Sequence, residues 1–127
     1  MIAVDTSALM AIVLGEPEAD ACMAVLEAAD DAVISAGTFA EALIVAGRRG
    51  VAEEMERLID GLGFTLQNVT PAVSRRVAEA YGQWGKGVHP AGLNFGDCFA
   101  YVAAKDSSCK LLFVGDDFSR TDIEAAA

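Results

Sequence analysis

Short apolar segments alternate with longer helix-like segments along the whole chain, and this alternation limits the chain to one class of fold. The predicted strands cover residues 2–4, 32–35, 64–69 and 111–114. Apolar residues at helical spacing predict helices over residues 8–14, 18–29, 39–49, 51–62, 71–84 and 98–106. Strands separated by helices pair in parallel and cover both faces of their sheet with those helices. We therefore expect an α/β protein with a central, mostly parallel sheet.

The segment 111–114 reads Leu-Leu-Phe-Val and has no polar position. A strand that is apolar on both faces is typical of the interior of a parallel sheet. We therefore expect this strand to be central and covered on both sides. The chain from Thr121 onward is expected to form a short terminal helix or a frayed end.

The composition indicates a single globular domain over residues 1–127. In the whole chain, 54% of the residues are hydrophobic and 22% are charged, and this composition excludes intrinsic disorder. The longest uncharged stretch near the start, residues 6–15, is about half as long as a membrane helix. No Lys or Arg precedes Arg48, so a secretory signal is not expected and the protein is predicted to be cytoplasmic. The three cysteines lack metal-site spacing and are expected to be reduced.

The chain has a single histidine, and this restricts the chemistry open to it. His89 lies in a Gly- and Pro-containing segment, 85–92, that is predicted to be a loop. One histidine excludes a two-histidine acid–base mechanism and disfavours a serine nucleophile paired with histidine. Any catalytic chemistry is therefore expected to use carboxylates.

Acidic residues fall where a parallel α/β sheet binds its ligands, at the carboxyl ends of the strands. Asp5 follows the first predicted strand, and Asp116 and Asp117 follow the last. Glu41 is expected in the first turn of the helix that follows the second strand. Asp97 is expected in the first turn of the helix that precedes the last strand. We therefore expect Asp5, Glu41, Asp97 and one of the two final aspartates to converge at one edge of the sheet.

Each of these carboxylates also has a purely structural interpretation. Asp5 suits a helix N-cap, and Thr38 and Glu41 have the spacing of a capping box. Asp97 follows an asparagine that suits the cap of its helix, where a negative charge is favourable. The two aspartates after the last strand are common turn residues. The joint pattern, rather than any single residue, favours a functional site.

Asp5, Glu41 and Asp97 have almost no basic residue near them in the sequence, Lys105 being the exception. Several carboxylates without a cationic partner repel one another unless they are protonated or bind a cation. Oxygen ligands favour Mg²⁺ or Mn²⁺, and such a site suits hydrolysis of a phosphate ester. The hydroxyls of Thr6 and Ser7 are expected to orient either the phosphate or the surroundings of the ion.

Four segments in order resemble the PIN-domain family, and within it the ribonuclease toxins of VapBC toxin–antitoxin systems. They read Val-Asp-Thr-Ser-Ala-Leu at 4–9, Phe-Ala-Glu at 39–41, Leu-Asn-Phe-Gly-Asp-Cys-Phe-Ala-Tyr at 93–101 and Leu-Leu-Phe-Val-Gly-Asp-Asp-Phe-Ser-Arg-Thr-Asp-Ile at 111–123. The resemblance covers essentially the whole chain. It implies a three-layer α/β/α sandwich, a Mg²⁺- or Mn²⁺-dependent endoribonuclease acting on RNA, a homodimer, and a cognate antitoxin that blocks the site.

The same resemblance implies roles for the acidic residues. Asp5 and Asp97 match the principal metal ligands, and Glu41 matches the third acidic residue. The fourth position is open, because many relatives place an acid where Asp116 stands and others where Asp117 stands. Relatives often carry a lysine directly before the glycine that corresponds to Gly115. This chain has Val114 at that position.

Two other function classes remain open at this point. The net charge of −10 is unusual for an enzyme that binds RNA phosphates, so a catalytically silent PIN-like module that binds a partner is one alternative. A silent module is expected to lack one or more of the carboxylates of the site, whereas this chain has an acidic residue at every one of these positions. Another Mg²⁺-dependent phosphoester hydrolase is the second alternative, but such enzymes place a lysine after a late strand, whereas Lys110 precedes the last one. The dimer surface is expected on segment 51–62 or 72–84, although core packing explains the same residues.

Overall fold

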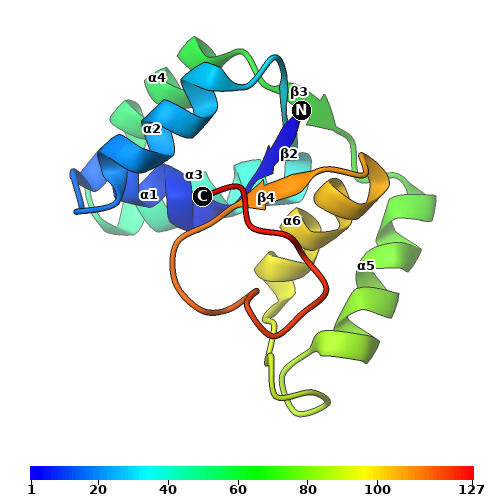
Figure 1. Ribbon diagram of the computed structural model, residues 1–127. Helices are drawn as coiled ribbons and strands as arrows, with labels where there is room; N and C mark the ends of the chain where they lie inside the picture. Colours follow the sequence, from blue (N-terminus) through cyan, green and yellow to red (C-terminus); the bar gives the residue numbers. More distant parts are fainter.

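The computed structural model describes all 127 residues and contains one sheet of four parallel strands between two groups of helices (Figure 1). The strand order is β3-β2-β1-β4. In chain order the elements are β1 (Ile2–Val4), α1 (Thr6–Leu14), α2 (Ala19–Ala28), β2 (Ala32–Ser35), α3 (Ala36–Arg48), α4 (Ala52–Leu62), β3 (Thr65–Gln67), α5 (Pro71–Trp84), α6 (Phe95–Asp106) and β4 (Lys110–Leu112).

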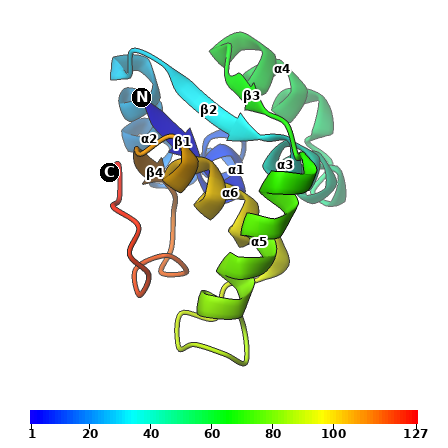
Figure 2. The same ribbon diagram turned by 90° about the vertical axis from the view of Figure 1, so that its right-hand side faces the viewer.

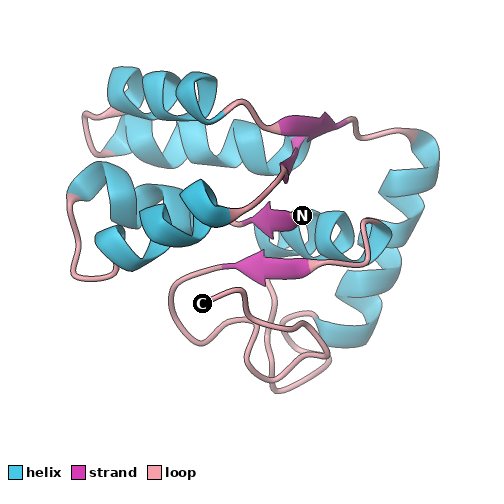
Figure 3. Cartoon of the chain, turned by 45° about the horizontal axis from the view of Figure 1, so that its top comes forward, coloured by secondary structure: helices cyan, strands magenta, loops and turns pink.

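Successive strand residues enter two separate cores, one on each face of the sheet. In β1, Ala3 packs into the core formed with α5 and α6, and Val4 packs into the core formed with α1, α2, α3 and α4. This follows from the alternation of side chains along a strand. Figure 2 shows α5 and α6 in front of the sheet, and Figure 3 shows the strands between the two helical layers. The predicted three-layer α/β/α sandwich is confirmed.

The prediction that the last strand is central was wrong, because β4 lies at the edge of the sheet beyond β1. Leu111 and Leu112 are nevertheless fully buried. The segment 121–127 covers this edge as an extended chain, rather than forming the short terminal helix or frayed end that was expected. The backbone N–H of Leu111 donates to the carbonyl of Glu124, and Ala126 N–H donates back to the carbonyl of Leu111, both at 2.9 Å. The strand is apolar because Leu111 and Leu112 pack into the cores on opposite faces of the sheet, while the chain end pairs with the backbone of its outer edge.

Helix α3 begins earlier than expected, because Ser35 is its N-cap and accepts a hydrogen bond from the backbone N–H of Gly37. The capping-box interpretation of Thr38 and Glu41 was therefore wrong. The Thr38 hydroxyl is buried without a hydrogen-bond partner, and Glu41 lies in the second turn of the helix rather than the first. This shift leaves the Glu41 carboxylate available for contacts outside its own helix.

The apolar side chains considered for a dimer surface are mainly core residues. In α4, Met55 and Ile59 are buried, and in α5, Val73 and Val77 are buried. The large hydrophobic side chains that remain exposed lie mostly on other segments, and the two most exposed in helices are Ile44 and Phe95, beside the acidic cluster described below. None of the helices has both the length and the hydropathy needed to cross a membrane.

Candidate active site

Asp5 lies at the carboxyl end of β1 and caps helix α1. Its Oδ2 accepts hydrogen bonds from the backbone N–H of Ser7 at 3.1 Å and from the Ser7 hydroxyl at 2.7 Å. The same hydroxyl accepts a hydrogen bond from the backbone N–H of Val114 at 3.0 Å. Ser7 thus joins the ends of β1 and β4, and this holds the buried Asp5 carboxylate at the edge of the sheet.

Asp97 lies in the first turn of α6, in a capping box with Asn94. The Asn94 side chain accepts from the backbone N–H of Asp97 at 2.8 Å, and Asp97 Oδ2 accepts from the backbone N–H of Asn94 at 3.0 Å. Only 6% of Asp97 is exposed. The expected capping role is therefore real, but it occupies one carboxylate oxygen and leaves the charge of Asp97 facing the other acidic residues.

Glu41 reaches the same region from α3. The Thr6 hydroxyl donates to Glu41 Oε1 at 2.6 Å. The Glu41 carboxylate also lies directly against the backbone of Gly96, where a side-chain Cβ would overlap it. Glycine at this position therefore allows Glu41 to approach the start of α6, one residue from Asp97. Gly96 was not among the predicted site residues, and its only sequence signal is its place before that aspartate.

Replacing Gly96 by alanine is expected to push the Glu41 carboxylate out of the cluster. The added methyl group overlaps the end of a side chain, so the fold is expected to persist with a loss below about 1.5 kcal/mol. The RNA cleavage that the resemblance implies is expected to fall by ~10-fold or more, because partners that orient a metal site typically contribute that much. Cleavage rates and urea unfolding measure the two effects. Gly82→Ala is the control, since its added Cβ meets no atom within 4 Å; equal cleavage losses in both variants would contradict this placement of Glu41.

The two aspartates after β4 differ in their surroundings. Both are exposed, and the backbone carbonyl of Asp116 accepts hydrogen bonds from Ser119, as expected for a turn residue. Asp117 is close enough to Asp97 to raise its pKa by charge repulsion. The charge of Asp117 thus contributes to the electrostatics of the cluster.

Burial and mutual repulsion shift the acidity of the two central carboxylates. Burial, with a smaller contribution from the charge of Glu41, raises the pKa of Asp5 to about 6. Burial raises the pKa of Asp97 to about 7, helped by the charges of Asp5, Asp117 and Glu41. The basic side chains that form ion pairs do so elsewhere, with Glu53, Glu54, Asp106 and Asp122. The cluster is thus a concentration of negative charge with no cationic side chain paired to it.

These residues fit a divalent ion that prefers oxygen ligands. Asp5 Oδ1 is buried and has no hydrogen-bond partner, which is costly unless a cation or proton satisfies it. No group of three or more acidic, His or Cys side chains is arranged so that it could hold a metal ion by itself. Mg²⁺ commonly uses one or two carboxylates and completes its shell with water and substrate phosphate. The hydroxyls of Thr6 and Ser7 both bond to carboxylates, so they orient Glu41 and Asp5 within this cluster.

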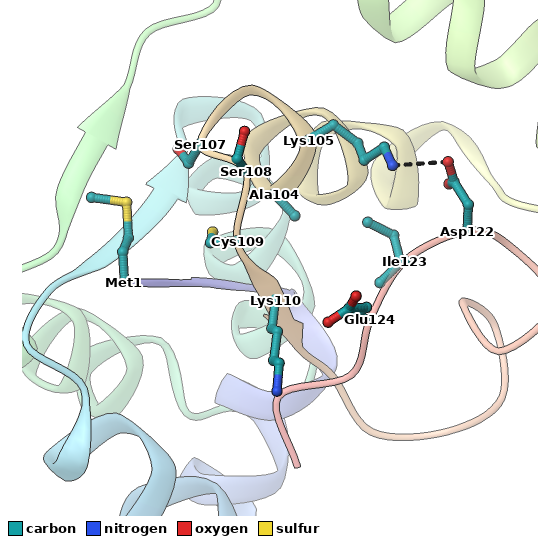
Figure 4. Close-up of a pocket in the computed structure, with 10 residues that line it drawn as sticks. All are labelled: Met1, Ala104, Lys105, Ser107, Ser108, Cys109, Lys110, Asp122, Ile123 and Glu124. Atoms are coloured by element: carbon teal, nitrogen blue, oxygen red, sulfur yellow. Dashed lines mark hydrogen bonds and ion pairs between the residues drawn. The ribbon is translucent and has the colours of Figure 1, made fainter.

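A pocket of about 590 Å³ lies away from the carboxylates, at the amino ends of β1 and β4 (Figure 4). Its lining includes Met1, Lys105, Cys109 and Lys110, and it contains none of the clustered acids. The candidate active site is therefore an open cluster at the carboxyl edge of the sheet rather than this cavity.

Comparison with known proteins decides the family. A sequence model of the PIN domain matches residues 2–124. The chain belongs to the PIN-domain family, on its VapC ribonuclease branch. Ribonuclease VapC36 of Mycobacterium tuberculosis is 44% identical over 125 residues, which cover 95% of this chain and 90% of that protein. Ribonuclease VapC42 of the same species is 39% identical over 127 residues and 97% of each chain.

Solved structures of VapC proteins share the fold of this PIN domain. The Mycobacterium tuberculosis toxin VapC20, which cleaves the sarcin–ricin loop, superimposes with a TM-score of 0.79 over 97% of this chain and 96% of its own, at 16% identity. A toxin–antitoxin complex from Klebsiella pneumoniae gives a TM-score of 0.71 at 18% identity, with 96% of this chain and 93% of that chain covered. The predicted family and the predicted fold are therefore both confirmed.

Proposed function

We propose that this VapC-type ribonuclease is a metal-dependent endoribonuclease toxin that hydrolyses RNA phosphodiester bonds and is inhibited by a cognate antitoxin. The observation that carries the proposal is the pair of buried carboxylates, Asp5 and Asp97, held close together with no basic side chain to neutralise them. A fold that retains such an unfavourable arrangement needs a compensating ligand, and a divalent cation is the ligand that oxygen atoms favour. We propose cytoplasmic RNA as the substrate.

Within this proposal, Asp5 and Asp97 hold Mg²⁺ or Mn²⁺, and Glu41 and Asp117 supply the third and fourth carboxylates. When bound, the ion polarises the phosphodiester and makes a water molecule more acidic. Thr6 and Ser7 keep the carboxylates oriented through the hydrogen bonds described above. Asp116, which the resemblance also allowed as a ligand, acts instead through its backbone in the turn.

The proposed partners follow from charge and exposure. A body with a net charge of −10 attracts a basic segment, and this suits an antitoxin that covers the acidic cluster. The Klebsiella pneumoniae complex is a precedent for pairing within this fold. We also propose a homodimer. Ile44 is 58% exposed one helical turn after Glu41, and Phe95 is 70% exposed just before Gly96, so these two side chains offer apolar contact area at the rim of the cluster.

The two rival functions are less well supported. A silent binding module has no need to keep four carboxylates in one uncompensated group. A phosphatase or phosphoacceptor domain needs a lysine near its acidic residues at the carboxyl edge of the sheet. Here Lys110 begins β4 and lies at the opposite edge, in the pocket of Figure 4.

The test is cleavage of a panel of structured RNAs by the purified protein. Cleavage is expected with Mg²⁺ or Mn²⁺, no cleavage is expected with EDTA, and excess Mg²⁺ is expected to restore it. Mapping the product ends would identify the target sequence. Asp97→Asn, prepared identically, controls for contaminating nucleases. Cleavage that continues in EDTA, or that is unchanged in this variant, would refute the proposal.

A further inference from the structure

The chain after β4 forms a strap, residues 115–127, that has no helix and runs along the molecule beside α6 (Figure 1). Three contacts fix it. Phe118 is 1% exposed and packs its ring against Phe113, with centroids 5.2 Å apart. Asp122 bonds to α6, and Ala125 pairs with Leu111 of β4. Since regular secondary structure does not hold the strap, these contacts determine where its side chains lie.

One face of α6 meets the strap at two places. Asp97, Tyr101 and Lys105 are four residues apart and therefore share this face. The Tyr101 hydroxyl donates to Asp122 Oδ1 at 2.7 Å, and Lys105 Nζ donates to Asp122 Oδ2 at 2.8 Å, as Figure 4 shows for the lysine. The Trp84 indole N–H donates to the Tyr101 oxygen at 3.0 Å, so the phenolic proton is directed to the aspartate. Both oxygens of Asp122 are thus bound by one helix.

At the other end of the same face, the strap approaches the start of α6, because Phe118 lies in the buried core that also contains Cys98 and Tyr101, and Asp117 directly precedes it. The carboxylates of Asp97 and Asp117 are close enough for their like charges to repel each other. Asp117 is exposed and the structure gives its side chain no hydrogen bond or ion pair. Repulsion alone would move Asp117 and its part of the strap away from α6 into solvent. Two anchors of the strap oppose this movement, namely the buried Phe118 ring next to Asp117 and the contacts of Asp122 with α6.

We infer that Asp122 is a positioning residue, which holds the strap against Tyr101 and Lys105 and thereby keeps Asp117 beside Asp97. This inference rests on the proposed function and deepens it, because it assigns a role outside the carboxylate cluster. Asp122 does not contact the cluster itself. It acts by fixing the register between the strap and α6, so that the fourth carboxylate is present before the ion and the RNA arrive.

A second ion pair on α6 provides a matched control. Arg76 of α5 bonds to Asp106 at the end of α6 at 2.6 Å, and its side chain is 44% exposed, similar to the 45% of Lys105. Neither Arg76 nor Asp106 belongs to the strap. Exposed ion pairs contribute little to overall stability, so loss of either one is expected to leave the fold intact. Of the two ion pairs, only that of Asp122 is expected to hold Asp117 in place.

The experiment compares Asp122→Ala, Asp117→Asn, the double variant and the control Asp106→Ala. Hydrogen exchange of the metal-free protein reports the strap directly. Exchange of backbone amides in residues 115–121 is expected to be about 10-fold faster in Asp122→Ala and unchanged in Asp106→Ala. RNA cleavage at limiting Mg²⁺ is expected to fall about 10-fold in Asp122→Ala. In the Asp117→Asn background the same change is expected to cost less than about 2-fold, because the two residues act through one contact.

Three results would overturn the inference. The first is an Asp122→Ala protein whose amide exchange and RNA cleavage rates equal those of the wild type. The second is full cleavage activity in Asp117→Asn. The third is a double variant whose loss of cleavage equals the product of the two single losses. If Asp122→Ala folds poorly, Tyr101→Phe removes one of the two donors without changing the strap, and the same coupling to Asp117 is expected. A wild-type protein that cleaves RNA without metal dependence would refute the proposed function instead, and the exchange measurement would still decide the role of Asp122.

Discussion

Asp97→Asn is expected to abolish metal-dependent RNA cleavage while making the metal-free protein more stable at pH 8. Asparagine has the same shape and retains an oxygen for the capping hydrogen bond from the Asn94 backbone. It removes one of the two central charges that hold the cation. Partners outside the metal shell alone contribute 10- to 100-fold, so loss of a ligand is expected to lower cleavage by more than ~100-fold.

The gain in stability follows from the pKa of Asp97, which burial raises from 3.8 to about 7. Between these values the folded state binds more protons than the unfolded state. The stabilising effect of protonated Asp97 is complete below pH 3.8 and is lost as the pH rises through about 7. Above that pH the wild-type protein carries a buried charge that asparagine lacks. We expect Asp97→Asn to add about 2 to 4 kcal/mol to the free energy of unfolding at pH 8.

Urea unfolding from pH 4 to pH 8 with EDTA measures this effect, and the pH dependence is expected to be shallower in Asp97→Asn. Mg²⁺ is expected to raise the unfolding temperature of the wild-type protein at pH 8 and to have little effect on the variant. Asp60→Asn, which removes an exposed carboxylate on α4, is expected to leave cleavage and stability unchanged. An Asp97→Asn protein that is less stable than wild type at pH 8 would contradict the electrostatic description of the cluster.

Phe118→Ala is expected to cause the largest loss of stability among single changes in the strap, about 3 to 5 kcal/mol. The ring is fully buried beside Phe113 and anchors a segment that has no helix or strand of its own. Its removal leaves a cavity under the strap, next to Asp117. Cleavage is therefore expected to fall as well, at temperatures where the protein is still folded.

Phe95→Ala is the matched control, because it deletes the same side chain at a site that is 70% exposed. Its expected cost is at most about 1 kcal/mol, from the lost contact with Phe99. Urea unfolding at pH 5, where the acidic cluster is less strongly charged, compares the two variants. Similar losses of stability in both would show that Phe118 does not anchor the strap.

Local sequence signals predicted much of the fold. Short apolar runs, one segment that alternates with period two, and helical spacing located all four strands and six helices, with differences at their ends. The caps at Asp5 and Asn94 were also predicted, because capping depends on residues within one turn. Glu41 was placed near the site for a reason that was only partly right. Its helix starts at Ala36, because Ser35 is a better-positioned cap than Thr38.

Some features could not be predicted because they depend on residues distant in the chain. The sequence favoured a central position for the last strand, since it shows that Leu111 and Leu112 are buried but not what buries them. The pattern was equally compatible with Asp116 and Asp117, which are adjacent and both suit a turn. We favour Asp117 because of the packing of the strap against α6.

The amino-acid sequence by itself determined the layer structure, the family and the set of acidic residues, because these follow from local periodicity and from short motifs. The tertiary structure alone decided the strand order, the close approach of Glu41 to Gly96, and the hydrogen bonds from α6 to Asp122. These depend on long-range contacts, whose geometry is set by how the helices and the chain end pack together. The charge of the cluster is likewise a tertiary property, since each carboxylate becomes costly only when the fold buries it beside the others.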